Sequence, residues 1–449
     1  MRTFFVQGGF PLRGEVVIQG AKNATQKILP ATVLWPGIYT LRNIALIEDA
    51  RALFSILQFL GADITFVNPH DVQINTENII SREIPPELTA RSTGTFLFAG
   101  ALLGRFGEAK VWHPGGDRIG KRPVTWHLEA FRRLGATVTE HDTFYEVRAP
   151  ALHGSAISFQ RPTANGAINA VITAMNARGT TRIERVAPEP EIQCALDFFQ
   201  LMGGQIRWVG ANALEVVGTP KGTGFGDMRV IPDRNDAATF LIAGALGHGP
   251  VTLHDVRPEH LLPLLELLQR VGVTVEILTN SETSSMTVQC DQLRTTDIQV
   301  TSRPFPGFST DWGPMVEVLL TQVPGNHVFH ETIFARRFAH IPELVQCMGA
   351  AIQSLDLPVD EQIYNFDREH IAPLAHAIAI SGASPLHGAS VHANDVRAGA
   401  ALVLAGLIAE GQTEVTGIEQ IERGYEAFHE RLRQLGASIT VEETRSAPQ

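Results

Sequence analysis

The chain has 449 residues, which is more than one hydrophobic core usually holds, so the default expectation is two domains. A composition of 44% apolar and 18% charged residues is typical of a soluble globular protein, and no apolar run is long enough to span a bilayer. The net charge of -11 argues against a nucleic-acid partner but allows small anionic ligands, because a few arginines can dominate the field in a cleft.

A short segment recurs six times along the chain: a bulky apolar residue, Gly, a small residue, any residue and a β-branched residue. Each copy follows an amphipathic run, such as 50–59 or 426–433, which predicts that a helix ends and a strand begins there. The glycine then occupies the left-handed position that favours glycine at helix C-termini. These glycines are Gly61, Gly135, Gly203, Gly272, Gly349 and Gly436.

A second marker keeps step with the first. It is a glycine that ends a helical run rich in Ala and Leu and precedes an alternating strand, and it lies 23 to 28 residues before the next glycine of the first kind. A repeat of about 70 residues is too long for a solenoid, so the units should close into globular domains, three to a domain. The second set comprises Gly37, Gly107, Gly179, Gly249, Gly325 and Gly411.

The cysteines and histidines give no sign of a metal site. Cys194, Cys290 and Cys347 have no paired or metal-type spacing and are expected to be buried apolar thiols. The nearest approach to a histidine ligand pair is His327 with His330, and we expect neither a metal nor an organic cofactor. The first residues lack a basic and apolar leader, which predicts a cytoplasmic location.

Many basic residues stand at junctions between repeat elements. Any one of them alone would be interpreted as a solvated surface charge. Because equivalent junctions of related units face the same way, together they predict a cationic cleft for carboxylate and phosphate groups. These residues are Lys22, Arg91, Arg118, Lys121, Arg122, Arg337, Arg397 and Arg423.

The segment 113–123 combines permissive backbone with charged side chains. Its glycines are Gly115, Gly116 and Gly120, and its charged residues include Asp117 and Arg118. This profile favours a closing lid over a ligand, although a plain surface turn would look similar.

Ordered motifs along the chain resemble those of the UDP-N-acetylglucosamine 1-carboxyvinyltransferase family, which are enolpyruvyl transferases of the EPSP synthase superfamily. The resemblance runs from residue 5 to residue 426, and many motifs at compatible spacing make it specific. The motifs are 12–23 (LRGEVVIQGAKN), Pro114-Gly115-Gly116, Ile119-Gly120, Arg122-Pro123-Val124, Glu189-Pro190-Glu191-Ile192, Ile231-Pro232-Asp233-Arg234, Ser309-Thr310-Asp311, Arg337-Phe338, 340–344 (HIPEL), Asp395-Val396-Arg397-Ala398 and Arg423-Gly424-Tyr425-Glu426.

The resemblance implies an α/β fold: a two-domain inside-out α/β barrel built of six βαβαββ-type units, with helices inside and sheets outside. One domain takes residues 22–231 and carries a mobile loop at 113–123. The other combines residues 1–21 with 232–449. Three of the six glycines of the first set fall on either side of residue 232, in agreement with this division.

The resemblance also implies a reaction in which phosphoenolpyruvate donates its enolpyruvyl group to the 3-hydroxyl of UDP-N-acetylglucosamine. Phosphate leaves through a tetrahedral intermediate, in the first committed step of peptidoglycan synthesis. The implied catalytic residues are Asp117, Asp311 as general base, Lys22 and Arg397. Those implied to bind phosphoenolpyruvate are Lys22, Arg122, Arg337, Arg397 and Arg423. Those implied to bind the UDP-sugar are Asn23, Arg91, Arg122, Pro123, Val124, Trp126, Thr163, Asp311 and Ile333. Asp49 and Asp395 are expected to orient basic groups.

Several positions depart from the family pattern. Asp117 stands where the family commonly has the loop cysteine that fosfomycin alkylates, and a carboxylate is a far poorer nucleophile, so we expect fosfomycin insensitivity. Thr125 and Trp126 replace an Asp-Leu pair near the uracil, and Asn165 replaces a glycine near the diphosphate. The interval from Gly349 to Gly436 is 87 residues against 68 to 77 elsewhere, which predicts a loop insertion at 355–390, far from the motifs.

Three hypotheses remain open at this point. The first is the peptidoglycan enzyme or a close paralogue. The second is an enolpyruvyl transferase of specialised metabolism that acts on another uridine nucleotide; a shikimate-pathway synthase is disfavoured because Asn23, not a serine, follows Lys22. The third is a non-catalytic nucleotide-binding paralogue. The implied donor ligands come from both halves of the chain, so closure on binding the acceptor is expected, whereas the sequence does not determine the oligomeric state.

Overall fold

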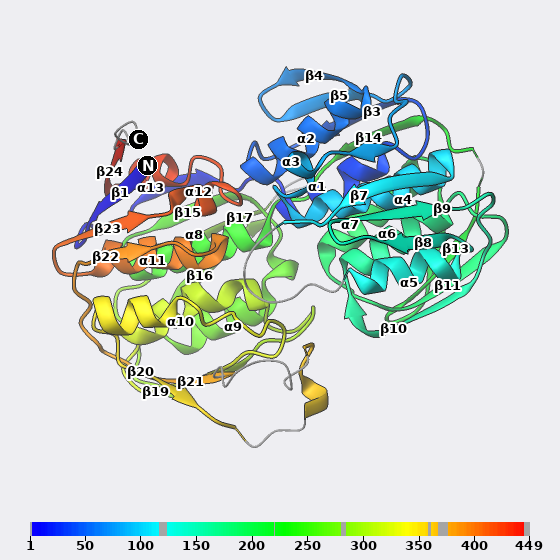
Figure 1. The fold of residues 1–449 in the computed structure, drawn as a ribbon. Coiled ribbons are helices and arrows are strands. Elements are labelled where there is room, and N and C mark those ends of the chain that lie inside the picture. Colours follow the sequence, from blue (N-terminus) through cyan, green and yellow to red (C-terminus); the bar gives the residue numbers. More distant parts are fainter. Residues whose placement is uncertain are drawn as a thin grey trace. The chain divides into compact units, whose positions relative to one another are not determined.

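A computed structural model describes residues 2–115, 124–219, 221–279, 284–357, 361–366 and 376–443. The chain divides into two compact units (Figure 1). Of the described residues, 20–115 and those from 124 to 231 form the central unit, and 2–19 with those from 232 to 443 form the terminal unit. Each unit has a hydrophobic core of its own.

The central unit contains three repeats, each with two helices and a sheet. The order of its elements matches the expected alternation of strand and helix. They are α1 (Lys22–Ala31), β3 (Ile38–Arg42), α2 (Glu48–Leu60), β4 (Asp63–Asn68), β5 (Asp71–Asn75), β6 (Glu83–Ile84), α3 (Pro86–Thr89), η1 (Thr93–Phe96), α4 (Leu97–Phe106), β7 (Glu108–Trp112), α5 (Thr125–Arg133), β8 (Thr137–Glu140), β9 (Phe144–Arg148), β10 (Ala156–Thr163), α6 (Asn165–Ala174), β11 (Thr180–Val186), α7 (Pro190–Leu201), β12 (Gln205–Gly210), β13 (Ala213–Val217) and β14 (Phe225–Arg229).

The terminal unit repeats the same plan and holds both ends of the chain. Its elements are β1 (Arg2–Gln7), β2 (Gly14–Val17), α8 (Arg234–Leu246), β15 (Val251–Val256), η2 (Pro258–His260), α9 (Leu262–Arg270), β16 (Thr274–Thr279), β17 (Ser284–Gln289), β18 (Gln299–Thr301), η3 (Thr310–Trp312), α10 (Gly313–Gln322), β19 (Asn326–His330), the π-helical turn η4 (Glu343–Cys347), β20 (Ile352–Leu355), η5 (Glu361–Ile363), β21 (Ala377–Ser381), β22 (Ser390–His392), α11 (Val396–Ile408), β23 (Gln412–Thr416), α12 (Ile418–Glu422), α13 (Phe428–Gln434) and β24 (Ser438–Glu443).

The described strands form six four-stranded sheets that share one topology. In each, an edge strand pairs in parallel with its neighbour, and the remaining two pairings are antiparallel. The sheet at the C-terminus is completed by the N-terminal strand, since β1 lies between β23 and β24 (Figure 1). The orders are β14-β3-β5-β4, β6-β7-β9-β8, β10-β11-β13-β12, β2-β15-β17-β16, β18-β19-β21-β20 and β22-β23-β1-β24.

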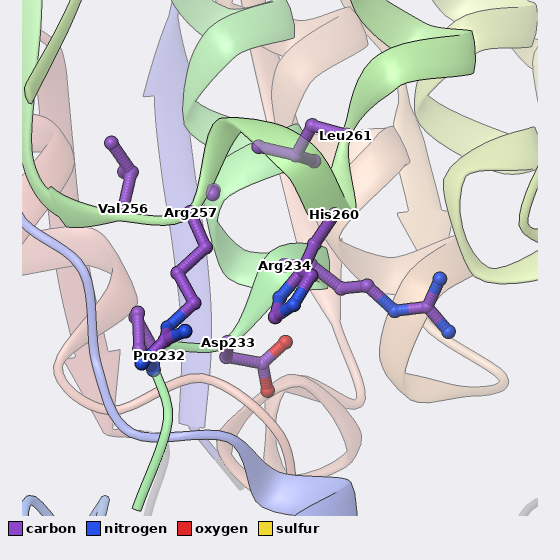
Figure 2. A pocket seen from close by; sticks show the side chains of 8 residues that line it. Pro232, Asp233, Arg234, Val256, Arg257, His260 and Leu261 are labelled. Carbon is purple, nitrogen blue, oxygen red and sulfur yellow. The ribbon is translucent and has the colours of Figure 1, made fainter. Parts of the chain in front are cut away.

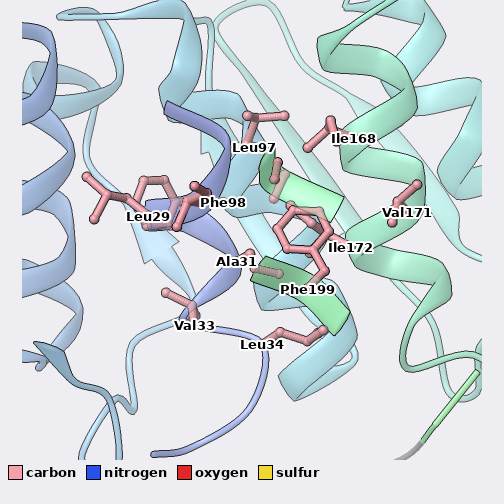
Figure 3. Packing of buried hydrophobic residues seen from close by; sticks show 14 of the residues in the cluster. Leu29, Ala31, Val33, Leu34, Leu97, Phe98, Ile168, Val171, Ile172 and Phe199 are labelled. Atoms are coloured by element: carbon pink, nitrogen blue, oxygen red, sulfur yellow. The ribbon is translucent and has the colours of Figure 1, made fainter. Parts of the chain in front are cut away.

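The helices that precede the second set of glycines lie inside each unit. In the central unit α1, α4 and α6 pack on one another, and Figure 3 shows Leu29, Phe98 and Ile172 meeting in their shared core. In the terminal unit α8, α10 and α11 do the same, and every residue of α8 is buried. Full burial of a side chain such as Leu or Phe contributes about 1.5–3 kcal/mol. Helices inside and sheets outside confirm the predicted fold class.

The first set of glycines adopts the predicted left-handed conformation at all six positions, with φ between 82° and 108°. In the second set the reason for glycine varies. Gly107 has φ 76°, but Gly37 and Gly249 are required by close approach, because a Cβ there would lie 1.8 Å from the Gly224 carbonyl oxygen and 2.3 Å from the Leu12 carbonyl oxygen. The repeated strand after each glycine is present in all six units.

The fifth repeat departs from the others and overturns one expectation. Its helix before Gly349 is reduced to η4, in which Leu344 and the following Met348 take the buried side. Cys347 therefore points outward and is exposed, with its Sγ 3.7 Å from a Glu343 carboxylate oxygen, so the prediction that all three thiols are buried is wrong for this one. Cys194 and Cys290 are buried as expected.

The longer segment at 355–390 is not remote from the motifs, which corrects a second expectation. Its β21 pairs antiparallel with β19, so the residues entering β21 must lie beside the end of β19. There the Asn365 amide donates to the Thr332 carbonyl oxygen at 2.7 Å, and the Tyr364 hydroxyl lies 2.9 Å from His330 Nε2. The segment thus contacts His330 and Thr332, which directly precede Ile333 or lie close before it in the sequence.

No helix within the described ranges combines the length and apolar character needed to cross a bilayer.

The left-handed glycines can be tested by substitution at Gly135. Its φ is 96° and the space around a Cβ is open, with no atom nearer than 3.5 Å, so Gly135→Ala isolates the backbone penalty. We expect a loss of about 1–2 kcal/mol in the free energy of unfolding, measured by urea denaturation. Gly210→Ala is the matched control, since φ is not positive there and a Cβ meets only the Ala213 Cβ at 3.9 Å. Equal destabilisation by the two substitutions would contradict the assignment.

Candidate active site

In the terminal unit, a capped turn begins each of the three inner helical segments. Asp233 accepts hydrogen bonds from the amides of Asn235 and Asp236 at 2.7 and 3.2 Å. Ser309 caps η3, which runs directly into α10, and Asp395 caps α11. Such caps satisfy the amide groups that a helix leaves unpaired at its start.

The second residue after each cap faces its counterparts in the other two repeats. These residues are Asn235, Asp311 and Arg397. Asn235 Nδ2 donates to Asp311 Oδ2 at 3.2 Å, and Arg397 Nε donates to the same oxygen at 3.4 Å. The equivalent junctions of the terminal unit therefore do come together, and they meet at the Asp311 carboxylate.

Arg337 lies on the buried side of this group. Its side chain is 1% exposed, and its guanidinium donates to Asp311 Oδ1 and, through Nε, to Thr310 Oγ1 at 3.2 Å. Its Nη1 is 3.8 Å from Asp395 Oδ1. Burial disfavours the charge, but the carboxylates of Asp311 and Asp395 outweigh it and raise the pKa of Arg337. Its role as a direct phosphoenolpyruvate ligand stays a prediction, whereas its contacts orient Asp311.

A buried glutamate supports the turn that carries Asp311. Glu331 Oε2 accepts from the Thr310 hydroxyl at 2.9 Å, and Oε1 accepts from the amides of Ile333 and Phe334 at 2.6 and 2.9 Å. Burial raises the pKa of the Glu331 carboxyl, against the lowering effect of Arg337 and of these donors. Ile333, expected at the acceptor, is thereby fixed to the same network as Asp311.

Arg397 contacts Tyr425, which lies two residues after Arg423 in the sequence. The Arg397 guanidinium lies 5.0 Å from the centre of the Tyr425 ring. Burial opposes the charge of Arg397, whereas Tyr425 and the Asp311 carboxylate raise its pKa. Arg423 is half-buried and donates to Gln420 Oε1 at 3.1 Å. Its loop is held by Gln19, whose Nε2 donates to the Gly424 carbonyl oxygen at 2.8 Å.

In the central unit, Lys22 at the start of α1 pairs with Asp49 at the start of α2. The Lys22 Nζ is 2.9 Å from Asp49 Oδ2, and the side chains are 7% and 3% exposed. Gln26 donates to the same Asp49 oxygen at 2.8 Å and to Ser92 Oγ at 3.2 Å. Asp49 and Asp395 thus contact the basic groups they were expected to orient.

Further predicted residues of the central unit lie at or near helix starts. Asn23, half-buried, accepts from Lys27 through its backbone oxygen at 2.6 Å, and Arg91 is exposed, with Nη2 3.7 Å from Glu48 Oε2. Trp126 is half-buried in α5, its ring 6.5 Å from that of Phe159.

Two further positions complete this set. Val124 is half-buried and directly precedes α5, and the Thr163 hydroxyl accepts from the Gly166 amide at 3.3 Å. Asp117, Arg118, Lys121, Arg122 and Pro123, with the rest of 116–123, lie outside the described residues.

A small hollow opens beside the start of α8 (Figure 2). Arg234, Arg257 and His260 contribute to its lining, next to the cap Asp233. It leaves no room for a bound molecule even of the size of water, so the hollow alone does not accommodate a nucleotide sugar. In the described part of the chain, His, Cys, Asp and Glu side chains form no group of three or more suited to a metal ion.

Sequence reasoning missed several members of this network. Asn235, Glu331 and Gln26 were not predicted, although each lies within four residues of a residue or motif that was. The signal at Asn235 was its position two residues after a capping aspartate, the same offset as Arg397 from Asp395. Glu331 and Gln26 carry no comparable signal, because the partners that tie them to the network, Thr310 for Glu331 and Asp49 and Ser92 for Gln26, are distant in sequence.

Comparison with known proteins decides the family. A profile of the EPSP synthase (3-phosphoshikimate 1-carboxyvinyltransferase) family matches residues 6–432. The chain is 37% identical over 440 residues to a UDP-N-acetylglucosamine 1-carboxyvinyltransferase of Halothermothrix orenii, covering 98% of this chain and 99% of that protein. The chain belongs to this family. It is an enzyme, a 1-carboxyvinyltransferase, so the non-catalytic alternative is set aside.

Other relatives and solved structures agree. A UDP-N-acetylglucosamine 1-carboxyvinyltransferase 2 of Carboxydothermus hydrogenoformans is also 37% identical, over 98% of this chain and 99% of that protein. The crystal structure of the enolpyruvyl transferase NikO from Streptomyces tendae superposes with a TM-score of 0.84 at 22% identity, over 99% of both chains. An EPSP synthase from Acinetobacter baumannii superposes with a TM-score of 0.73 at 18% identity, over 99% of this chain and 100% of that one. These structures share the fold.

The buried position of Arg337 predicts a large cost on its removal. Arg337→Met leaves the carboxylates of Asp311 and Asp395 without their common cation, and we expect a loss of about 3–5 kcal/mol in urea unfolding. Arg207→Met is the control: Arg207 pairs with Glu215 at 2.6 Å, but its side chain is 71% exposed, so the expected change is within about 0.5 kcal/mol. Similar losses for both would show that Arg337 is not an essential counter-charge.

Proposed function

We propose that the chain transfers the enolpyruvyl group of phosphoenolpyruvate to the 3-hydroxyl of UDP-N-acetylglucosamine and releases phosphate, the committing step of peptidoglycan synthesis. The observation that carries the proposal is near full-length identity of 37% to relatives named for this acceptor. The arrangement around Asp311 supports it, because it provides an oriented carboxylate among cationic groups.

Asp311 is proposed as the general base for the acceptor hydroxyl. Its side chain is 22% exposed, while the arginines and the asparagine that hold it are buried. A base must be held within hydrogen-bond reach of the proton it removes, and a carboxylate fixed on both oxygens loses little freedom when it does so. Asn23 is proposed to bind the same sugar.

The donor is proposed to bind through Lys22, Arg122, Arg397 and Arg423. The methylene carbon of phosphoenolpyruvate takes up a proton, the acceptor oxygen bonds to the adjacent carbon, and phosphate then leaves as a proton is lost from the new methyl group. The cationic side chains stabilise the charge on the carboxylate and the departing phosphate. Asp117 is proposed to supply the first proton. Lys22 belongs to the central unit and Arg397 to the terminal unit, so the proposal requires both.

One alternative is retained for the acceptor, another uridine nucleotide of specialised metabolism. Trp126 favours it, because this half-buried ring at the start of α5 offers a larger stacking surface than the family's leucine. Thr125 and Asn165 likewise depart from the pattern at the nucleotide.

The proposal is tested by phosphate release from phosphoenolpyruvate with UDP-N-acetylglucosamine, other UDP-sugars, UMP and shikimate 3-phosphate. We expect release with UDP-N-acetylglucosamine, and a loss of about 10²–10⁴-fold in kcat for Asp311→Asn. Asp197→Asn, an exposed aspartate that accepts from Gln193, is the control and should leave kcat unchanged. Release only with another uridine nucleotide would support the alternative, and release with none would reject both.

Asp117 predicts insensitivity to fosfomycin, because a carboxylate reacts far more slowly with an epoxide than a thiolate does. We expect full activity and an unchanged intact mass after incubation with the drug. Asp117→Cys is expected to gain both a mass increase and time-dependent inactivation. Modification of the native protein at Asp117 would contradict this prediction.

A further inference from the structure

We propose that Asn235 is a positioning residue for the reaction: it holds Oδ2 of Asp311 in the orientation from which this carboxylate accepts the acceptor's proton. The inference rests on the proposed role of Asp311. The inference goes beyond that role, because it assigns part of the orientation of Asp311 to a neutral side chain from a different repeat.

The side chain of Asn235 starts from a fixed backbone. The backbone amide of Asn235 donates to the Asp233 cap at 2.7 Å, and its backbone carbonyl oxygen accepts from the Thr239 hydroxyl at 2.9 Å. The neighbouring Asp236 receives two hydrogen bonds from Arg431, at 2.9 and 2.7 Å. Asn235 is 1% exposed, so the start of α8 presents its Nδ2 to Asp311 from a position that packing determines.

The side-chain atom of Asn235 that lies near Asp311 can be identified from the hydrogen bond between them. Nδ2 must be the atom near Asp311 Oδ2, at 3.2 Å, because the side-chain oxygen in its place would meet a carboxylate oxygen with no proton between them. The two other donors described on this carboxylate, Arg337 and Arg397, are cationic and hold the charged form. A neutral donor fixes the direction of Oδ2 while opposing proton uptake less than a third cation would.

The other end of the same side chain argues against a purely structural role. Asn235 Oδ1 is buried and has no hydrogen-bond partner among the described residues. An unmade hydrogen bond of a buried oxygen costs stability, so a residue selected for stability alone would not be an asparagine here. The described contact that uses its polarity is the one to Asp311.

The test is a double-mutant cycle on phosphate release, with the acceptor that gives turnover in the panel. Asn235→Ala is expected to lower kcat roughly 10- to 100-fold, the loss expected for a hydrogen bond to a charged group, with KM for phosphoenolpyruvate within about 3-fold. In the Asp311→Asn background the same change should lower kcat by less than about 2-fold, because its partner has already lost its function. Asp311→Asn is chosen because it keeps an oxygen for Arg337.

A second variant and a control separate positioning from folding. Asn235→Asp keeps the shape but puts an acceptor against Oδ2, so its loss in kcat should be at least as large as that of Asn235→Ala. Asn169→Ala removes a buried asparagine of α6 that bonds Gly100, Phe96 and His127; it should lower the unfolding midpoint but keep kcat per folded molecule within about 3-fold. Asn235→Ala should change kcat without a comparable fall in the midpoint.

The outcomes distinguish the two proposals. Turnover that depends on Asp311 but not on Asn235, or an equal effect of Asn235→Ala in both backgrounds, would overturn the positioning role alone. A native protein that releases no phosphate with any acceptor would overturn the proposed function and this inference with it.

Discussion

The candidate site depends on one requirement: the backbone amides at the buried starts of the inner helices need hydrogen-bond acceptors. The inner helices of each unit are enclosed by other elements, and the first amides of a helix have no partner within it. In the terminal unit the solution is a short acceptor at each start: Asp233, Ser309 and Asp395. These caps fix the backbone of the residues that come after them. Side chains two positions later are therefore placed by the fold itself, and the proposed chemistry uses Asp311 and Arg397 at those positions.

The second constraint is that buried charges must be compensated. It arises from the first, because the positions that the caps place in the interior include charged side chains. Bringing Arg337 and Arg397 into the interior costs several kcal/mol per charge unless carboxylates come with them. Asp311 meets both arginines, and Asp395 faces Arg337. The consequence is that Asp311, the more exposed of these two carboxylates, is also the one that both buried arginines contact. Orientation of Asp311, the proposed base, and stability of the interior thus depend on the same contacts.

The repeat architecture was predictable from the sequence because its markers are local. A helix that ends in a left-handed residue selects glycine within one turn, so Gly61 and its five counterparts could be recognised from spacing alone. Asp311, Arg397 and Lys22 were reached through motifs. Glu331 and Asn235 were missed because their importance arises from partners tens of residues away. Cys347 and the 355–390 segment were misjudged for a related reason, since both depend on how the fifth repeat packs.

The two units use one backbone plan for different purposes. Two residues after the corresponding starts, the terminal unit has Asn235, Asp311 and Arg397, whereas the central unit has Asn23, Gly94 and Gly166. A larger residue would be crowded at both glycines: a Cβ at Gly94 would lie 3.2 Å from the side chain of Gln26, which holds Asp49, and one at Gly166 would lie 3.1 Å from the Thr163 hydroxyl. At these positions the terminal unit has a side chain of its own, whereas Gly94 and Gly166 of the central unit leave room for the side chains of Gln26 and Thr163. The side chains at these equivalent positions thus differ between a unit that holds a carboxylate and a unit that holds a lysine through its partners.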